Sequence, residues 1–115
     1  MAKYEKSFKG DFDEFLNWLH KDITSGSISA SIEDESDVTI GEVNVAVRVY
    51  ERYSMMGGNR VSLNVTVVGY RDNIFVSAIT SGGSKAVFFK INTIGEESFL
   101  ELCIDSVESY ISKHR

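Results

Sequence analysis

The stretch EVNVAVRVYERYSMMGGNRVSLNVTV, residues 42–67, decides the fold class of this chain. Valine occupies every second position from Val43 to Val49, and an apolar residue occupies every second position from Val61 to Val67. Alternation with a period of two is typical of a strand that has one buried face. The two glycines at 57 and 58 lie between the runs and favour a chain reversal. The stretch therefore predicts two antiparallel strands whose apolar rows share one buried face.

The residues between the valines predict a second, solvated face of the same sheet. The candidate binding residues on or beside it are Arg48, Tyr50, Arg52, Tyr53, Asn59 and Arg60. Arginines alternating with a tyrosine suit a carboxylate, a phosphate or an acidic partner. The alternative is pairing within the sheet, with Glu42, Glu51 or other residues of that face.

Four more alternating segments flank this hairpin and predict further strands. They lie at residues 3–9, 27–33, 74–80 and 85–92, with turns at the acidic run 33–37 and at 71–73. The sequence Ser81-Gly82-Gly83-Ser84 has the composition of a phosphate-binding loop, but such a loop needs a following helix. Because the segment from Lys85 onward predicts a strand, a hairpin turn is the main interpretation. The alternative is the rim of a ligand pocket, with Ser81 and Ser84 as contacts.

Two segments have the period of an amphipathic helix. In the first, Asp11 is placed as an N-cap with Glu14 three residues later, and Gly26 marks the end. The second begins near Gly95. The apolar stripe of the first helix is Phe12, Phe15, Leu16, Leu19 and Ile23, and that of the second is Phe99, Leu100, Cys103, Ile104, Val107, Tyr110 and Ile111.

These elements predict an α+β fold in the order β-α-β-β-β-β-β-α. At 115 residues with no proline, the chain is expected to form a single domain over residues 1–115. Short turns make the central strands a meander, so the sheet of five to six strands is antiparallel. Two helices with one apolar stripe each pack on one face of the sheet. The other face is left to solvent or to a partner.

Composition and charge exclude several classes of function. A net charge of −5 argues against nucleic acid as a partner. No apolar run approaches the roughly 20 residues that span a bilayer, so no membrane partner is expected. The N-terminal residues lack the apolar stretch of a secretory signal, and one cysteine fits a reducing compartment. The predicted location is cytoplasmic.

No catalytic, metal or cofactor site stands out. His20 has no second histidine nearby and is interpreted as a helix-surface residue, while Cys103 falls in an apolar stripe and is interpreted as core. The acidic run 33–37 lacks the spacing of a calcium loop. No acid/base pair or nucleophile is recognisable by type and spacing, which argues against an enzyme. Trp18 lies off the main stripe, and its ring is either a contact surface or packed against a neighbouring segment.

Several stretches together resemble a family of small bacterial proteins of unknown function, over nearly the whole chain. They are SISAS at 27–31, VRVYERYS at 47–54, GGNRVSLNV at 57–65, AITSGGS at 78–84 and FFKINT at 88–93. The resemblance implies a bacterial, cytoplasmic protein and no particular activity. The element order is also similar to that of helix-grip domains, whose curved sheet wraps a C-terminal helix and often encloses an apolar ligand. The chain is shorter than those domains and lacks a second helix after the first strand.

Two functional hypotheses follow. The first is a non-catalytic binding module for a small ligand or an acidic partner, bound between sheet and helix or on the Arg48/Tyr50/Arg52 face. The alternative is a self-associating protein, a homodimer that uses the uncovered sheet face. Tyr50, Phe75 and Phe88 are the aromatic side chains expected to contribute to that face.

Overall fold

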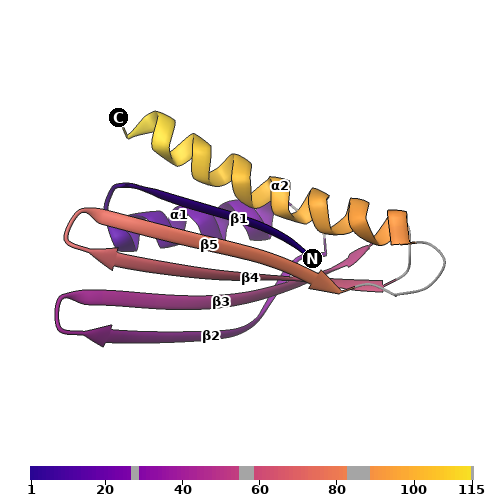
Figure 1. Ribbon diagram of the computed structural model, residues 1–115, viewed down its shortest axis with the longest axis horizontal. Coiled ribbons are helices and arrows are strands. Elements are labelled where there is room, and N and C mark those ends of the chain that lie inside the picture. Colours follow the sequence, from indigo (N-terminus) through magenta and orange to yellow (C-terminus); the bar gives the residue numbers. More distant parts are fainter. Residues whose placement is uncertain (27–28, 55–58, 83–88, 115) are drawn as a thin grey trace.

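The described residues form one five-stranded antiparallel sheet and two helices (Figure 1). The computed structural model describes residues 1–26, 29–54, 59–82 and 89–114. The strands lie in the order β1-β5-β4-β3-β2. The elements are β1 (Ala2–Lys9), α1 (Phe12–Ser25), β2 (Ser31–Ile40), β3 (Val43–Ser54), β4 (Asn59–Tyr70), β5 (Asn73–Gly82) and α2 (Phe89–Lys113).

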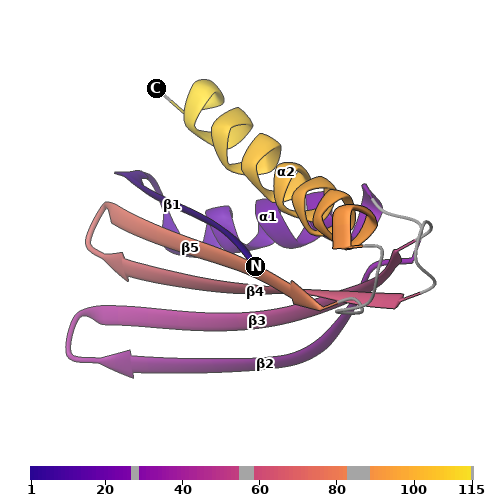
Figure 2. The ribbon, with the colours of Figure 1, turned by 45° about the vertical axis from the view of Figure 1, so that its right-hand side comes forward.

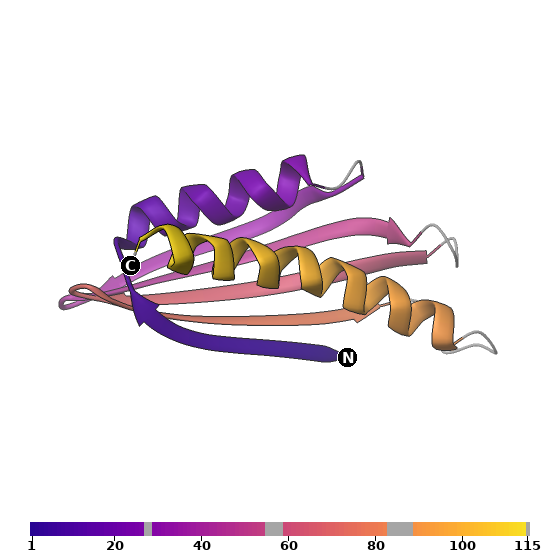
Figure 3. The same ribbon diagram turned by 90° about the horizontal axis from the view of Figure 1, so that it is seen from above.

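Both helices lie on the same face of the sheet, as the views in Figures 2 and 3 show. Helix α2 contacts β5, β1 and β4, and helix α1 contacts α2 and β4. This arrangement confirms the predicted α+β class with two helices on one face. We call the opposite face, which carries Val43, Val45, Val47 and Val49, the open face. Neither helix is long and apolar enough to span a membrane within the described part of the chain.

The start and end of α1 follow the sequence signals. The carboxylate of Asp11 accepts a hydrogen bond of 2.9 Å from the Glu14 amide, which satisfies a free donor of the first turn. At the other end, the Gly26 amide donates to the Asp22 carbonyl at 2.8 Å. Phe15, Leu19 and Ile23 are buried, so the predicted stripe faces the core.

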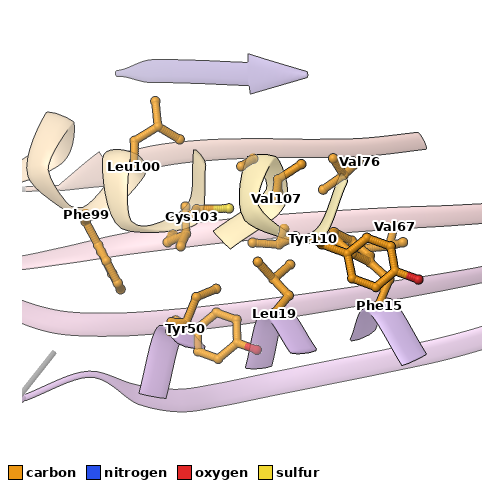
Figure 4. Close-up of a cluster of buried hydrophobic side chains, with 14 of the residues drawn as sticks. Phe15, Leu19, Tyr50, Val67, Val76, Phe99, Leu100, Cys103, Val107 and Tyr110 are labelled. Atoms are coloured by element: carbon orange, nitrogen blue, oxygen red, sulfur yellow. The ribbon is translucent and has the colours of Figure 1, made fainter. Parts of the chain in front are cut away.

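The core lies between the helices and the sheet (Figure 4). The ring of Tyr110 packs edge-on against Phe15, with centroids 5.1 Å apart, and Phe99, Cys103 and Val107 are fully buried along the same helix. Each of these four α2 residues belongs to the predicted stripe of the second helix. Burial of these rings and aliphatic side chains is the main favourable term for this fold.

The face assigned to β3 was wrong. Arg48 pairs with Val65 and Tyr50 with Leu63, so these residues lie on the helix-covered face, while the four valines lie on the open face. Tyr50 is only 1% exposed, and Ala46 is fully buried. The register of the hairpin decides which face a strand buries, because a shift of one residue exchanges the two faces. Both faces of β3 carry residues that can pack, so the alternation alone does not choose between them.

Two further segments differ from the sequence prediction. The acidic run expected as a turn belongs to β2, which pairs with β3 and has a bulge between Ile32 and Asp34. β2 is an edge strand in which every residue except Ile32 is exposed, so it tolerates charged side chains. In the segment expected as a strand at 85–92, residues 89–92 belong to α2, and 85–88 lie outside the described residues, as do the glycines at 57 and 58.

Candidate functional site

The site residues predicted from sequence separate onto the two faces of the sheet. Arg48, Tyr50 and Arg52 lie under the helices, whereas Tyr53, Arg60 and Ser81 lie on the open face. Asn59 begins β4, and Ser84 lies outside the described residues. The sheet therefore separates Arg48, Tyr50 and Arg52 from Tyr53 and Arg60, which were expected on or beside one surface, whereas Ser81 was expected in a turn or at the rim of a pocket.

On the open face, the predicted residues contact one another at the ends of β3 and β4. The guanidinium of Arg60 lies 5.2 Å from the centroid of the Tyr53 ring and 3.0 Å from a carboxylate oxygen of Glu51. The hydroxyl oxygens of Ser81 and Ser62 are 2.9 Å apart. This is the cross-strand pairing that the sequence left as the alternative to ligand binding.

Under the helices, Arg52 packs over a core aromatic ring. Its guanidinium carbon lies 4.7 Å from the centroid of Phe99, the geometry of a cation–π contact. Burial lowers the pKa of Arg52 from its ordinary value.

A groove of about 560 Å³ lies between α1 and the outer strands β2 and β3. Three elements line it: Phe12, Asp13, Leu16, Asn17 and His20 from α1, Glu35, Asp37, Val38 and Thr39 from β2, and Asn44, Val45 and Arg48 from β3. The groove exists because the fully buried residues of the α1 stripe, Phe15, Leu19 and Ile23, face the core. Phe12 and Leu16, the partly buried residues of the same stripe, line the groove instead. The groove thus has an apolar wall on the helix and charged groups on the strands.

Helix α1 reaches the sheet at a glycine. A Cβ added to Gly69 of β4 would lie 2.5 Å from Cδ1 of Phe12 and 3.0 Å from its Cβ. Because glycine has no side chain, the Phe12 ring can rest directly on the strand. This contact sets the distance between the sheet and the N-terminal end of α1, which forms one wall of the groove.

Arg48 is the cation of the groove. Its side chain is 16% exposed, and its Nη2 lies 3.0 Å from Asp37 Oδ1, while Nε lies 3.8 Å from Glu35 Oε2. Nη1 also donates to the Val47 carbonyl at 3.0 Å. Two carboxylates and a backbone oxygen therefore already satisfy the guanidinium.

His20 and Tyr50 connect the groove to the core. His20 Nδ1 and the Tyr50 hydroxyl are 2.8 Å apart. Burial raises the pKa of Tyr50 to about 12, against a smaller lowering effect of the nearby Arg48 charge. The hydroxyl is therefore neutral at physiological pH and can donate to, or accept from, the imidazole.

The charges of the groove do not cancel. Asp13, Glu35 and Asp37 face a single arginine, and one histidine cannot balance the remaining carboxylates, so the lining is negative. Within the described residues, no group of three or more His, Cys, Asp or Glu side chains is placed to hold a metal ion. Cys103 lies in the core, where burial raises the pKa of its thiol to about 12. The groove therefore has a negative lining, and Cys103 is not one of its lining residues.

Sequence reasoning placed His20 on the helix surface, and it is exposed on α1, but its position in a groove was not predicted. Glu35 and Asp37 were missed because they were interpreted as part of a turn. The signal that could have found these two acids is the register in which Glu35 pairs with Arg48 and Asp37 with Ala46. Trp18 packs rather than projecting: it is half-buried, and its indole N–H donates to the Ser106 carbonyl at 3.0 Å.

Comparison with known proteins gives a family and a fold. The model of a family of unknown function, DUF6054, matches residues 1–111. Among solved structures, a Pseudomonas aeruginosa protein of unknown function, for which a regulatory role has been suggested, is 10% identical with a TM-score of 0.52 over 70% of each chain. A Thermus thermophilus protein is 8% identical with a TM-score of 0.40 over 97% of each chain. No protein with a curated description matches the sequence.

Proposed function

We propose a non-catalytic binding role for this chain, which belongs to the DUF6054 family of unknown function. The proposed site is the groove between α1 and the strands β2 and β3. The observation that carries the proposal is its size and lining. Its volume of about 560 Å³ lies within the roughly 300–1,000 Å³ of small-molecule sites, and charged side chains converge on an apolar wall.

The charges of the groove favour a cationic ligand over the acidic one expected from sequence. Arg48 is already held by Asp37 and Glu35, so an incoming carboxylate would have to displace both. An amine would instead add a favourable partner for the surplus negative charge. The ligand class we propose is a small organic amine whose carbon chain lies against Phe12 and Leu16.

The experiment is calorimetric titration of the protein at low ionic strength with diamines and polyamines, and with dicarboxylates of the same length. Asp13→Asn and Asp37→Asn each remove one groove charge, and we expect each to weaken amine binding by roughly twofold to fivefold, the range of exposed ion pairs. Glu42→Gln is the matched control, because Glu42 lies in the β2–β3 turn outside the groove, 3.8 Å from Arg71. Binding of dicarboxylates in preference to amines, or equal losses in the control, would overturn the proposal.

We also propose self-association through the open face as a second function. The supporting observation is the exposure of large apolar side chains on that face: Val38 is 50% exposed, Ile40 67%, Phe75 38% and Ile79 39%. A contiguous apolar patch of this kind is typical of an interaction surface. Of the rings expected there from sequence, Phe75 lies on the face, Tyr50 lies in the core, and Phe88 is outside the described residues.

A further inference from the structure

We propose that two copies of this chain pack their open faces together about a two-fold axis parallel to β4. This inference rests on the self-association proposed above and adds its partner, its geometry and its contacts. It uses the open face, whereas the charged side chains of the groove lie on the helix-covered face; Val38 and Val45 are the groove-lining residues that also belong to the open-face rows.

The sheet register sorts the open face into rows that run across all five strands. One row is Lys3, Ile79, Asn64, Val49 and Asp34, from β1 to β2. Because β4 is the middle strand, a two-fold axis along it exchanges β1 with β2 and β5 with β3. Lys3 of one copy then faces Asp34 of the other copy, and Ile79 faces Val49 in the same way. Asn64 lies at the axis and faces Asn64 of the other copy.

The neighbouring rows match in the same way. In the row formed by Ser7, Phe75, Val68, Val45 and Val38, the axis brings Phe75 opposite Val45 and Val68 opposite itself. The row between these two has Thr66 in its centre, with Ser77 and Val47 on either side. In the row of Val68, apolar side chains therefore meet apolar side chains across the axis, whereas the small polar side chains of Asn64 and Thr66 each face their own symmetry mate.

Charge decides the direction of the axis. Along β1 the open face carries Lys3 and Lys9 with Glu5 between them, a net positive edge, and along β2 it carries Asp34. An axis perpendicular to the strands would place β1 against β1 and the lysines near each other. An axis parallel to the strands instead places Lys3 opposite Asp34 at both edges of the interface, while Glu5 meets Ser36 and Lys9 meets Ile40, so no like charges of the two edge strands meet.

The size of the face matches what a stable dimer needs. Five strands spaced about 4.8 Å apart give a width of about 24 Å, and the ten residues of β2 give a length of about 33 Å. The face therefore offers roughly 800 Å² per copy, about the area that each partner buries in a standard interface. Two such sheets would pack about 10 Å apart, with the two β4 strands parallel to each other.

The test measures the mass of the full chain by sedimentation equilibrium over a range of concentrations. We expect the unaltered chain to approach twice its 12.8 kDa. Thr66→Glu places two carboxylates opposite each other at the axis and should give monomers, whereas Thr66→Val at the same position should keep the dimer. Far-UV circular dichroism of each variant reports whether it is folded.

Charge reversal at the edges tests the axis and does not depend on Thr66. Lys3→Glu and Asp34→Lys should each raise the dissociation constant about threefold to tenfold, since each reversal affects two symmetry-related pairs. The double variant should return to within about twofold of the unaltered chain. Added salt should weaken the unaltered dimer, because these edge pairs are exposed.

The possible failures are distinguishable. A monomer at every concentration would overturn self-association itself. A dimer that survives Thr66→Glu but is lost in Ser36→Pro, which disrupts the edge of β2, would overturn open-face pairing in favour of edge pairing. A dimer lost in Thr66→Glu but not restored by the double charge reversal would overturn the proposed axis and leave self-association standing.

Discussion

Replacing Gly69 by alanine should push the N-terminal end of α1 away from the sheet. The new methyl group would lie 2.5 Å from Phe12 Cδ1, much closer than carbon atoms approach in a packed core. Overpacking of this kind costs about 1–3 kcal/mol. The lower chain entropy of unfolded alanine offsets about 0.4–1 kcal/mol of that cost. We therefore expect the free energy of unfolding to fall by about 1–2 kcal/mol.

Urea unfolding of a double-mutant cycle tests whether Phe12 is the cause. Phe12→Ala alone should cost about 2 kcal/mol, roughly half the value for a fully buried ring, because Phe12 is half-buried. With that ring removed, Gly69→Ala should add little further loss. Gly41→Ala is the control for a glycine replacement that destabilises the protein without a clash. The φ of +61° at Gly41 makes alanine unfavourable by about 1–2 kcal/mol, yet nothing lies within 4 Å of the added Cβ. Additive losses for Gly69→Ala and Phe12→Ala, within about 0.5 kcal/mol, would refute the reasoning.

Two other predictions concern α2. Ser106→Ala removes a 2.6 Å hydrogen bond from a buried hydroxyl to the Asp22 carboxylate and should lower the free energy of unfolding by about 1.5–3 kcal/mol in urea titrations; a loss below about 0.5 kcal/mol would contradict this. Cys103 should react with an aromatic disulfide reagent at pH 8 only as fast as the protein unfolds, because the thiol is buried and its pKa is raised to about 12. Complete labelling of the folded protein within seconds would disprove this. Since the unfolded thiol loses its proton at lower pH than the folded one, the contribution of Cys103 to stability should also decline as the pH rises above about 9, as urea titrations across pH can show.

The sequence predicted those elements whose local signals agree with their packing. The first helix had an N-cap at Asp11, a single apolar stripe and a terminal glycine, and all three signals describe one helix. The stripe of the second helix from Phe99 to Tyr110 was equally clear. The start of the second helix was not clear from the sequence. Gly95 is unfavourable in a helix interior, and the apolar residues before it have strand propensity. Tertiary packing can override such local preferences over a few residues.

The candidate site was predicted less well, since it depends on pairing between distant segments. The choice of face for β3 follows from its register with β4, which no local pattern of Val43–Arg52 reveals. The groove forms only when β2 lies beside β3, so that Asp37 and Glu35 reach Arg48. A run of acids looks like a solvated turn until the arginine that it pairs with is known.

The position of β1 has a consequence for the order in which the strands can pair during synthesis. Strands β2 to β5 pair with their neighbours in the chain, but β1 pairs with β5, as in the contact of Phe8 with Ile74. During synthesis, residues 2–9 are made before their partner strand and cannot pair with it until residues 73–82 have followed. Loop-closure entropy also makes such distant pairing slow. The first strand is therefore expected to dock late, and its lysine-rich segment stays unpaired in the nascent chain until β5 has been made.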